Sequence, residues 1–470
     1  MSLLSAIHAS RTGLLANTRR AEIVSSNIAN AQDENYSRRS LSVTEGIGGG
    51  VQVLGVSRAM NTAMDALFRS EMSYAAKADV MSHSLSLYTI ELGDIDSEIS
   101  LPAQLANFEN TLGLLSNAPE NANLQQQTLN AAEMLTQTLR DANSALGQIN
   151  TRAVDGIATD VKTANATLEE IARINTDIAH TDRGTDAYAS LEDRLGAQLD
   201  KLSEVIEIDV TYDTEGRAKV HTAEGQTLVF ASYVNELSFD RAAMALYAGT
   251  EDITPGVVGR RNSDQGSIAG HFEMMGTVVP QMQIELDEIA RSLIEGFEDA
   301  DASLAPGQAG LFTDRGFAYD PANHSGLAGR IAVNAAVDPQ QGGELYRLRD
   351  GIGATAPGAI SDNSQLLDFV TVFSDLQSFA PEAGQGTNTR ISDFVAGVFA
   401  KQQSRRVEAE ASFENYTAST ETFRSARLDA KGVNIDTELQ QLTLIEQAYN
   451  ANSQVLRVAS QMIDTLLDAV

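Results

Sequence analysis

Apolar and small residues recur at alternating steps of four and three at both ends of this chain. Such spacing places side chains on one stripe of a helix and is typical of helices that pair along a seam. The stripe near the start consists of Leu3, Ile7, Ser10, Leu14, Asn17, Ala21, Val24 and Ile28. The stripe near the end consists of Leu442, Ile445, Tyr449, Asn452, Leu456, Ala459, Ile463, Leu466 and Val470.

These stripes need a cover, because exposed apolar surface costs about 25 cal/mol per Å². Either the other terminus or another subunit can supply it, and both can do so at once. The residues predicted to carry this assembly packing are Ile7, Leu14, Val24, Ile28, Leu442, Ile445, Tyr449, Leu456, Ile463 and Leu466.

Between the ends the pattern is helical with one exception. Apolar spacing over 135–178 predicts one very long helix or two in line. Further helices are expected over 72–115, with an interruption near Pro102, and over 193–204, 268–301, 365–378 and 392–430. The exception is 205–265, where β-branched residues, the turn Asp213–Gly216 and alternating residues predict a β-hairpin with further strands. The fold class is therefore mainly α with a small β-rich insertion, an elongated rod of long helices whose N- and C-terminal helices pair like a coiled coil.

The order of elements predicts nested rather than tandem domains. We expect a terminal helical assembly domain from 1–40 plus 431–470 and a long-helix shaft domain from 41–204 plus 266–430. The third part is an outward-facing β-rich insertion over 205–265.

Composition narrows the function classes. The chain has 470 residues and a net charge of −31, which disfavours nucleic acid and anionic membrane surfaces as partners. It has no cysteine, so disulfides and thiol chemistry are excluded. We expect neither a cleavable secretion signal nor a membrane span, because no apolar run is long enough for either.

Catalytic signatures are absent from the sequence. The six histidines are scattered without metal-ligand spacing, and there is no nucleophile elbow, phosphate loop or zinc motif. We therefore predict no catalytic, cofactor-binding or metal-binding residues, no cofactor, and a protein that is not an enzyme.

Two matched segments at opposite ends resemble the signatures of the flagellar rod, hook and hook-associated axial protein family. The first is Ser25–Ala31 followed by Asn35–Arg39, and the second is Gly432–Leu439 followed by Gln447–Asn452. Ser26 and Asn35 depart from the family pattern, which has Asn and Gly at these places. The signature residues are Asn27, Ile28, Ala29, Asn30, Tyr36, Ser37, Arg38, Asn434, Ala448 and Tyr449. The segment Tyr36–Arg38 with Gly49–Arg58 is most similar to the hook-associated branch.

The resemblance implies a structural part of the bacterial flagellum that serves assembly and motility, an adaptor ring joining hook to filament. It implies secretion without a cleavable signal through the flagellar type III export apparatus, and an extracellular location in the flagellum. The implied partners are copies of the chain in a ring oligomer, the hook protein, hook-associated protein 3 as the second junction protein, a cytoplasmic export chaperone and the export apparatus.

Three alternatives stay open at this point. One is a hook or rod type of the same family instead of a junction type. The second is a secreted hydrolase with catalytic carboxylates within 205–350. The third is an adhesin or signalling protein with coiled-coil termini, which should be a stable dimer in dilute solution.

Overall fold

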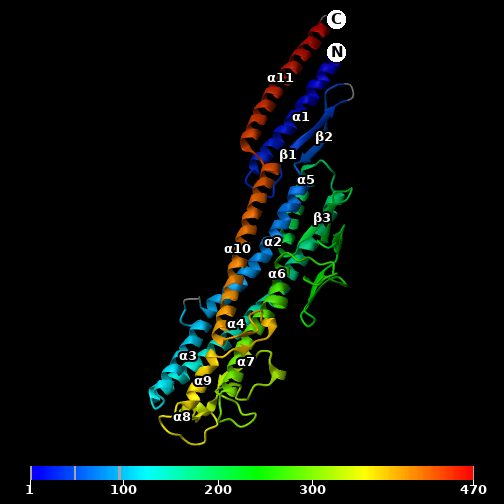
Figure 1. Cartoon of the computed structure of the whole chain (residues 1–470). Helices are drawn as coiled ribbons and strands as arrows, with labels where there is room; N and C mark the ends of the chain where they lie inside the picture. Colours follow the sequence, from blue (N-terminus) through cyan, green and yellow to red (C-terminus); the bar gives the residue numbers. More distant parts are fainter. Residues whose placement is uncertain (1–2, 47–48, 94–96, 469–470) are drawn as a thin grey trace. The chain divides into compact units, whose positions relative to one another are not determined.

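Long helices dominate the computed structural model, which describes residues 3–46, 49–93 and 97–468 (Figure 1). The helices are α1 (Leu3–Ala29), α2 (Thr62–Leu92), α3 (Leu101–Asn117), α4 (Ala122–His180), α5 (Asp186–Val205), α6 (Ser267–Glu273), α7 (Val279–Asp299), α8 (Tyr346–Asp350), α9 (Ser364–Ser374), α10 (Ile391–Lys431) and α11 (Ile435–Asp468). The prediction of a mainly helical chain is confirmed, and α4 is one continuous helix.

Strands are short and form small antiparallel sheets. They are β1 (Arg39–Glu45), β2 (Val51–Arg58), β3 (Ile208–Tyr212), β4 (Ala218–Thr222), β5 (Thr227–Phe230), β6 (Tyr233–Val234), β7 (Leu237–Asp240), β8 (Ala245–Ala248), β9 (Glu251–Asp252), β10 (Phe312–Asp314), β11 (Ile331–Val333), β12 (Gln377–Ser378) and β13 (Asn388–Thr389). Seven of them, β3 to β9, fall within 205–265, so the small β-rich insertion is confirmed.

The chain divides into two units. The first contains Met1–Lys77, Ala158–Ala269 and Glu414–Val470, and the second contains Ala78–Ile157 and Gly270–Phe413. Both chain ends therefore belong to the first unit.

In the first unit, α1 and α11 lie side by side and antiparallel (Figure 1). The β1–β2 hairpin covers another side of α1, with Arg39 opposite Arg58 and Glu45 opposite Val51. The backbone N–H of Val51 donates a hydrogen bond of 3.1 Å to Oγ1 of Thr12 on α1. The N-terminal helix is therefore packed by two elements.

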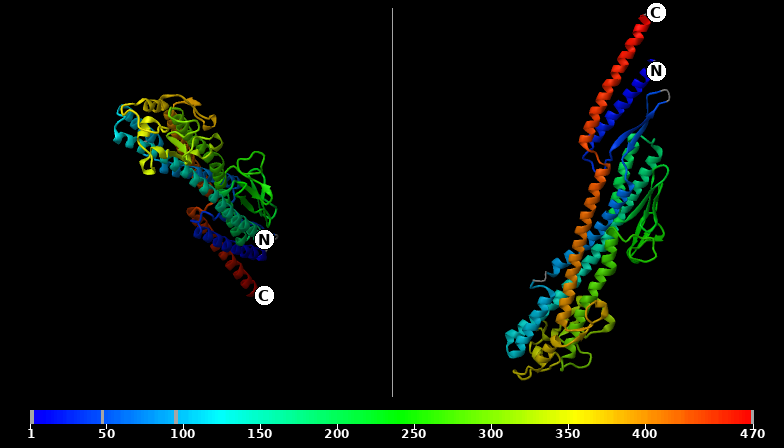
Figure 2. Two further views of the ribbon diagram at one scale, coloured as in Figure 1. Left: turned by 90° about the horizontal axis from the view of Figure 1, so that it is seen from below. Right: turned by 45° about the horizontal axis from the view of Figure 1, so that its top comes forward.

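The β-rich insertion is fastened to α4 by two asparagines. Asn175 donates to the carbonyl of Ala218 at 2.9 Å and accepts from the N–H of the same residue at 2.9 Å. Asn165 makes the same reciprocal pair with Leu237, at 2.8 and 2.7 Å. Ala218 is the first residue of β4 and Leu237 the first residue of β7, so each amide satisfies the backbone at the start of one strand. These strands belong to the sheets β3–β4–β5–β6 and β7–β8–β9, drawn in green in Figure 2.

The second unit has an aromatic core. Phe312 of β10 meets Phe108 of α3 and Phe297 of α7 edge to face, with ring centroids 5.4 and 5.1 Å apart. Phe108 and Phe297 are tilted to one another at 5.6 Å. Phe369 and Phe373 of α9 complete the cluster. This packing orders the glycine-rich stretch 306–358, which contains β10, β11 and short turns of helix.

Several boundaries differ from the sequence predictions. The expected helix 193–204 begins seven residues earlier, because Thr185 caps α5 by accepting a hydrogen bond of 3.2 Å from the N–H of Tyr188. The expected helix 268–301 contains a π-helical turn at Met274–Val278. Pro280, which has no N–H to donate, follows that turn. The interruption expected near Pro102 is present, since α2 ends at Leu92 and α3 begins at Leu101 with Pro102 in its first turn.

No helix among the described residues is both long enough and apolar enough to cross a membrane.

Candidate assembly surface

The α1–α11 pair is the element that contains both predicted stripes. The helices come closest at Gly13, where a Cβ would lie 2.9 Å from Nδ2 of Asn452. Seven residues of α1 are buried: Ser10, Gly13, Ala16, Asn17, Ile23, Val24 and Asn27. This set shares Ser10, Asn17 and Val24 with the predicted stripe but is wider than that stripe, and the β1–β2 hairpin also packs against α1.

The predicted packing residues lie at or near this contact. Val24 is buried, whereas Ile7, Leu14 and Ile28 of α1 and Leu442, Ile445, Leu456 and Ile463 of α11 are half-buried. Tyr449 is 46% exposed. The side chain of Leu466 lies outside the described residues. Their role in assembly stays a prediction.

A second apolar stripe on α11 faces solvent in the single chain. Leu444, Val455, Val458 and Met462 are 63%, 47%, 49% and 52% exposed. At 3.6 residues per turn they lie on one face, about a third of a turn around the helix from the stripe against α1. The sequence analysis missed this stripe because the regular seam was assigned first, although the spacing of 11, 3 and 4 residues was there to be read.

Asn27, the centre of the N-terminal signature, is fully buried and joins three segments. Its Nδ2 donates to the carbonyl of Arg39 at 2.9 Å and to Oε2 of Glu438 at 3.1 Å. Its Oδ1 accepts from the hydroxyl of Tyr36 at 2.9 Å and from the N–H of Arg39 at 3.1 Å. Burial raises the pKa of Tyr36, which keeps this hydroxyl a donor. The two signatures therefore meet around one amide.

Glu438 is the residue that connects this network to the C-terminal signature. It is fully buried, and its Oε1 accepts a hydrogen bond of 2.6 Å from Nε of Arg38. The sequence analysis quoted Glu438 within a motif but did not predict it as a site residue. A buried carboxylate is only stable with such partners.

The remaining signature residues shape helix ends or lie on the surface. Asn434 caps α11, since its Oδ1 accepts from the N–H of Thr437 at 3.0 Å. Asn30 donates to the carbonyl of Ser26 at 2.8 Å at the end of α1. Ala29 is exposed and Ala448 is half-buried.

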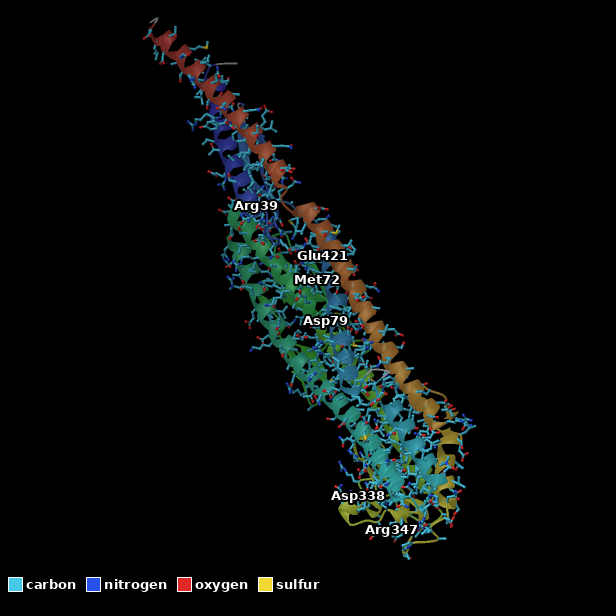
Figure 3. All side chains as sticks on the ribbon, turned by 90° about the vertical axis from the view of Figure 1, so that its left-hand side faces the viewer. Arg39, Met72, Asp79, Asp338, Arg347 and Glu421 are labelled. Carbon is cyan, nitrogen blue, oxygen red and sulfur yellow. The ribbon has the colours of Figure 1, made fainter. Side chains whose placement is uncertain are left out.

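Asp193 of α5 binds the segment that follows Tyr36 and the end of the β1–β2 hairpin. Its carboxylate accepts hydrogen bonds from the N–H of Ser37 at 3.2 Å, from Arg39 at 3.2 Å and from Arg58 at 2.7 Å. Arg39 is labelled in Figure 3. Asp193 was not predicted from the sequence, because nothing near it in the chain marks its partners. It fixes the β1–β2 hairpin beside α1.

A second cluster of buried charges holds the end of α10. Arg427 pairs with Asp65 and with Asp200, both at 2.6 Å, and Asp200 also pairs with Arg69 at 2.7 Å. Lys431, one turn further, is buried as well. Burial lowers the pKa of Lys431 to about 8, and the nearby charge of Arg427 acts in the same direction.

A groove of about 380 Å³ lies between α1, β1 and α11. Apolar side chains contributed by Ile23, Leu41, Leu444 and Ile445 line it together with three arginines, of which Arg20 has no ion pair among the residues that the structure describes. A groove that is both apolar and basic is unusual on a chain with 64 acidic and 33 basic residues.

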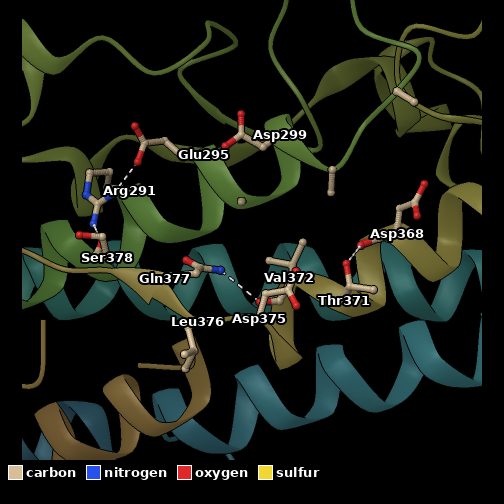
Figure 4. A pocket seen from close by; sticks show the side chains of 13 residues that line it. Arg291, Glu295, Asp299, Asp368, Thr371, Val372, Asp375, Leu376, Gln377 and Ser378 are labelled. Atoms are coloured by element: carbon tan, nitrogen blue, oxygen red, sulfur yellow. Dashed lines mark hydrogen bonds and ion pairs between the residues drawn. The ribbon is translucent and has the colours of Figure 1, made fainter. Parts of the chain in front are cut away.

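The second unit contains an acidic pocket of about 620 Å³, the natural place for the hydrolase alternative (Figure 4). Glu295, Asp299, Asp368 and Asp375 line it. Its arginine, Arg291, is held by Glu288 and Glu295, and these partners raise its pKa against the opposing effect of burial. Within the described residues no group of three metal-ligand side chains occurs. Arg291 also donates a hydrogen bond to the carbonyl of Ser378, which ties α7 to β12. We assign no chemistry to this pocket.

Comparison with known proteins agrees with the signatures. A family model described as the flagellar hook-associated protein FlgK helical domain matches residues 92–305. A model described as the flagellar basal body rod FlgEFG protein C-terminal matches residues 424–469, which include α11. Together the two matches cover more than half of the chain.

Curated relatives match over the full length. Flagellar hook-associated protein 1 of Bacillus subtilis (strain 168) is 22% identical over 100% of this chain and 99% of its own. The protein of the same name from Escherichia coli (strain K12) is 22% identical over 99% of each chain. A solved structure of the flagellar hook junction protein FlgK from Burkholderia pseudomallei matches 53% of this chain and 46% of that chain, with 17% identity and a TM-score of 0.42.

The two family models and the curated relatives confirm the resemblance found in the two terminal signatures. The names of these relatives are those of structural flagellar proteins and not of enzymes. The chain therefore belongs to the flagellar rod, hook and hook-associated axial family, within it to the group of hook-associated protein 1, and is a structural component of the flagellum.

Proposed function

We propose that this chain forms the adaptor ring that joins the flagellar hook to the filament. The observation that carries the proposal is the exposed stripe Leu444, Val455, Val458 and Met462 on α11. Such a stripe, parallel to one already covered by α1, is what a helix needs when it packs within its own chain and against a neighbouring copy.

The charge pattern of α11 supports packing between copies. Two copies that each carry a net charge of −31 repel one another, which opposes assembly. The segment 440–463 contains only Glu446 and Arg457 as charged residues, so its own net charge is zero. Contact through this segment adds no like-charge repulsion of its own.

We further propose the domain roles predicted from the sequence. Residues 1–40 plus 431–470 form the assembly domain, 41–204 plus 266–430 form the shaft, and 205–265 face outward. The partners are copies of the chain, the hook protein and hook-associated protein 3.

Export is proposed to occur unfolded, through the flagellar type III apparatus with a cytoplasmic chaperone, to the extracellular flagellum. The absence of cysteine supports this route, because no crosslink can form before the chain passes through.

Deletion of the gene tests the function. Electron microscopy of the deletion strain should show hooks without filaments, and flagellin should be lost to the medium; expression of the wild-type chain should restore filaments. Normal filaments on the deletion strain would exclude a required junction role.

A further inference from the structure

The last described turn of α11 exposes an apolar side chain between two acidic ones. Because Asn27 contacts Glu438 and Gly13 approaches Asn452 in an antiparallel pair, the same register places Met462 opposite Leu3. The last described residues of α11 therefore pass beyond the first described residue of α1 (Figure 1). This turn exposes Leu467, at 70%, between Asp464 and Asp468.

The groove between α1, β1 and α11 complements this turn, because it is apolar and carries positive charge. Its apolar lining includes Ile23 and Leu444, and Arg20 at its side has no carboxylate partner among the described residues. Asp464 and Asp468 likewise have no ion pair among the described residues. Apolar surface and opposite charges are thus left unsatisfied at two places on the same helix pair.

The two places cannot meet within one chain. Leu444 and Leu467 lie on the same helix, separated by 23 residues, which corresponds to about 34 Å at 1.5 Å per residue. Only another molecule can bring such an end to the groove.

We propose that the acidic, apolar end of α11 from one copy docks into this groove of a second copy. This contact rests on the proposed ring function and specifies how copies join. Leu467 enters beside Ile23 and Leu444, and Asp464 or Asp468 pairs with Arg20. The contact is head to tail, because it joins two different surfaces, and repetition of such a contact builds a ring or a helix. Charge pairing at the rim of the groove sets the register.

Because the chain has no cysteine, introduced thiols report this contact without background. We would introduce Leu444→Cys and Leu467→Cys together, treat the full-length chain at increasing concentration with a short thiol–thiol crosslinker, and analyse it under denaturing conditions. The expected product is a ladder of dimers, trimers and larger species, whereas each single variant gives no ladder. Leu15→Cys with Leu467→Cys is the matched control, since Leu15 is 62% exposed but lies on the far face of α1.

Charge variants test the pairing in the same assay. Arg20→Glu should reduce the ladder and weaken association by about tenfold or more, because it places like charges together. Asp464→Arg with Asp468→Arg should restore the ladder in the Arg20→Glu background. Arg11→Glu, an exposed arginine on α1 away from the groove, should leave it unchanged.

Sedimentation of the wild-type chain separates this contact from the ring function. Oligomers that form without the crosslinked ladder, or an equal ladder from the control pair, would overturn the docking contact and leave assembly of copies standing. A chain that stays monomeric at every concentration would also overturn the contact, while the gene deletion still judges the junction role.

Discussion

At the scale of single residues, buried hydrogen bonds explain why the family signatures contain these polar residues. The Asn27 side chain gives two donors and an acceptor to three separate segments, so an apolar residue of similar size cannot replace it. Tyr36 and Glu438 are fixed by the same network. The sequence showed these residues as a motif, and the structure supplies their physical reason.

Replacement of Asn27 should destabilise the first unit. Asn27→Ala leaves the Arg39 N–H without a partner, leaves the Tyr36 hydroxyl with only the longer 3.4 Å contact to Ser26, and removes a donor from Glu438. The free energy of unfolding should therefore fall by at least about 2 kcal/mol. Urea unfolding followed by circular dichroism measures this. Asn35→Ala, at an exposed position in the same signature, should change it by less than about 0.5 kcal/mol. Equal effects of the two variants would contradict the role of the network.

Lys431 should make stability depend on pH. Its pKa is lowered to about 8 in the folded chain, so between pH 8 and its ordinary value near 10.5 the unfolded chain binds more protons. Stability from this group therefore rises with pH across that window, and its penalty is constant below pH 8. Lys431→Met should raise the urea midpoint at pH 7, and the gain should shrink at pH 9.5. A gain of the same size at both pH values would show that the charge is not the cause.

At the scale of elements, α11 has two apolar faces with different partners. Ala459 is 4% exposed and faces α1, whereas the adjacent Val458 is 49% exposed on the second stripe. Ala459 therefore packs within the molecule, whereas its neighbour Val458 is available for the proposed packing between molecules.

This difference can be tested with one pair of variants. Ala459→Asp buries a charge and should lower the free energy of unfolding by at least about 2 kcal/mol. Val458→Asp should leave it within about 0.5 kcal/mol of the wild type but abolish incorporation into flagella. Urea unfolding and immunoblots of isolated flagella measure the two effects. Incorporation of Val458→Asp at the wild-type level would contradict the assembly role of the stripe.

Apolar periodicity predicted an element well where the buried face of that element packs against a single neighbouring layer. The helix α4 and the hairpin β3–β4 follow directly from their apolar spacing. The buried set of α1 shares Ser10, Asn17 and Val24 with the predicted stripe but is wider than that stripe. The β1–β2 hairpin also packs against α1, and spacing alone does not show such a tertiary neighbour. Asp193 and Asp200 were missed for the same reason, since their arginine partners lie far away in the sequence.

At the scale of the whole molecule, two exposed regions should differ in solvent exposure after assembly. If the proposed function holds, the stripe on α11 should become covered when the flagellum assembles, and the β-rich insertion should stay in contact with solvent. A chain without cysteine allows each region to be marked by a single introduced thiol. Val455 on the stripe and Val258 in the insertion are suitable positions, at 47% and 100% exposure.

The most direct test is the rate of maleimide labelling of Val455→Cys and Val258→Cys, in the purified chain and in isolated flagella. Both thiols should react in the purified chain, whereas in flagella only the thiol at position 258 should still react. Equal labelling of position 455 in the free chain and in flagella would contradict the claim that assembly covers this stripe.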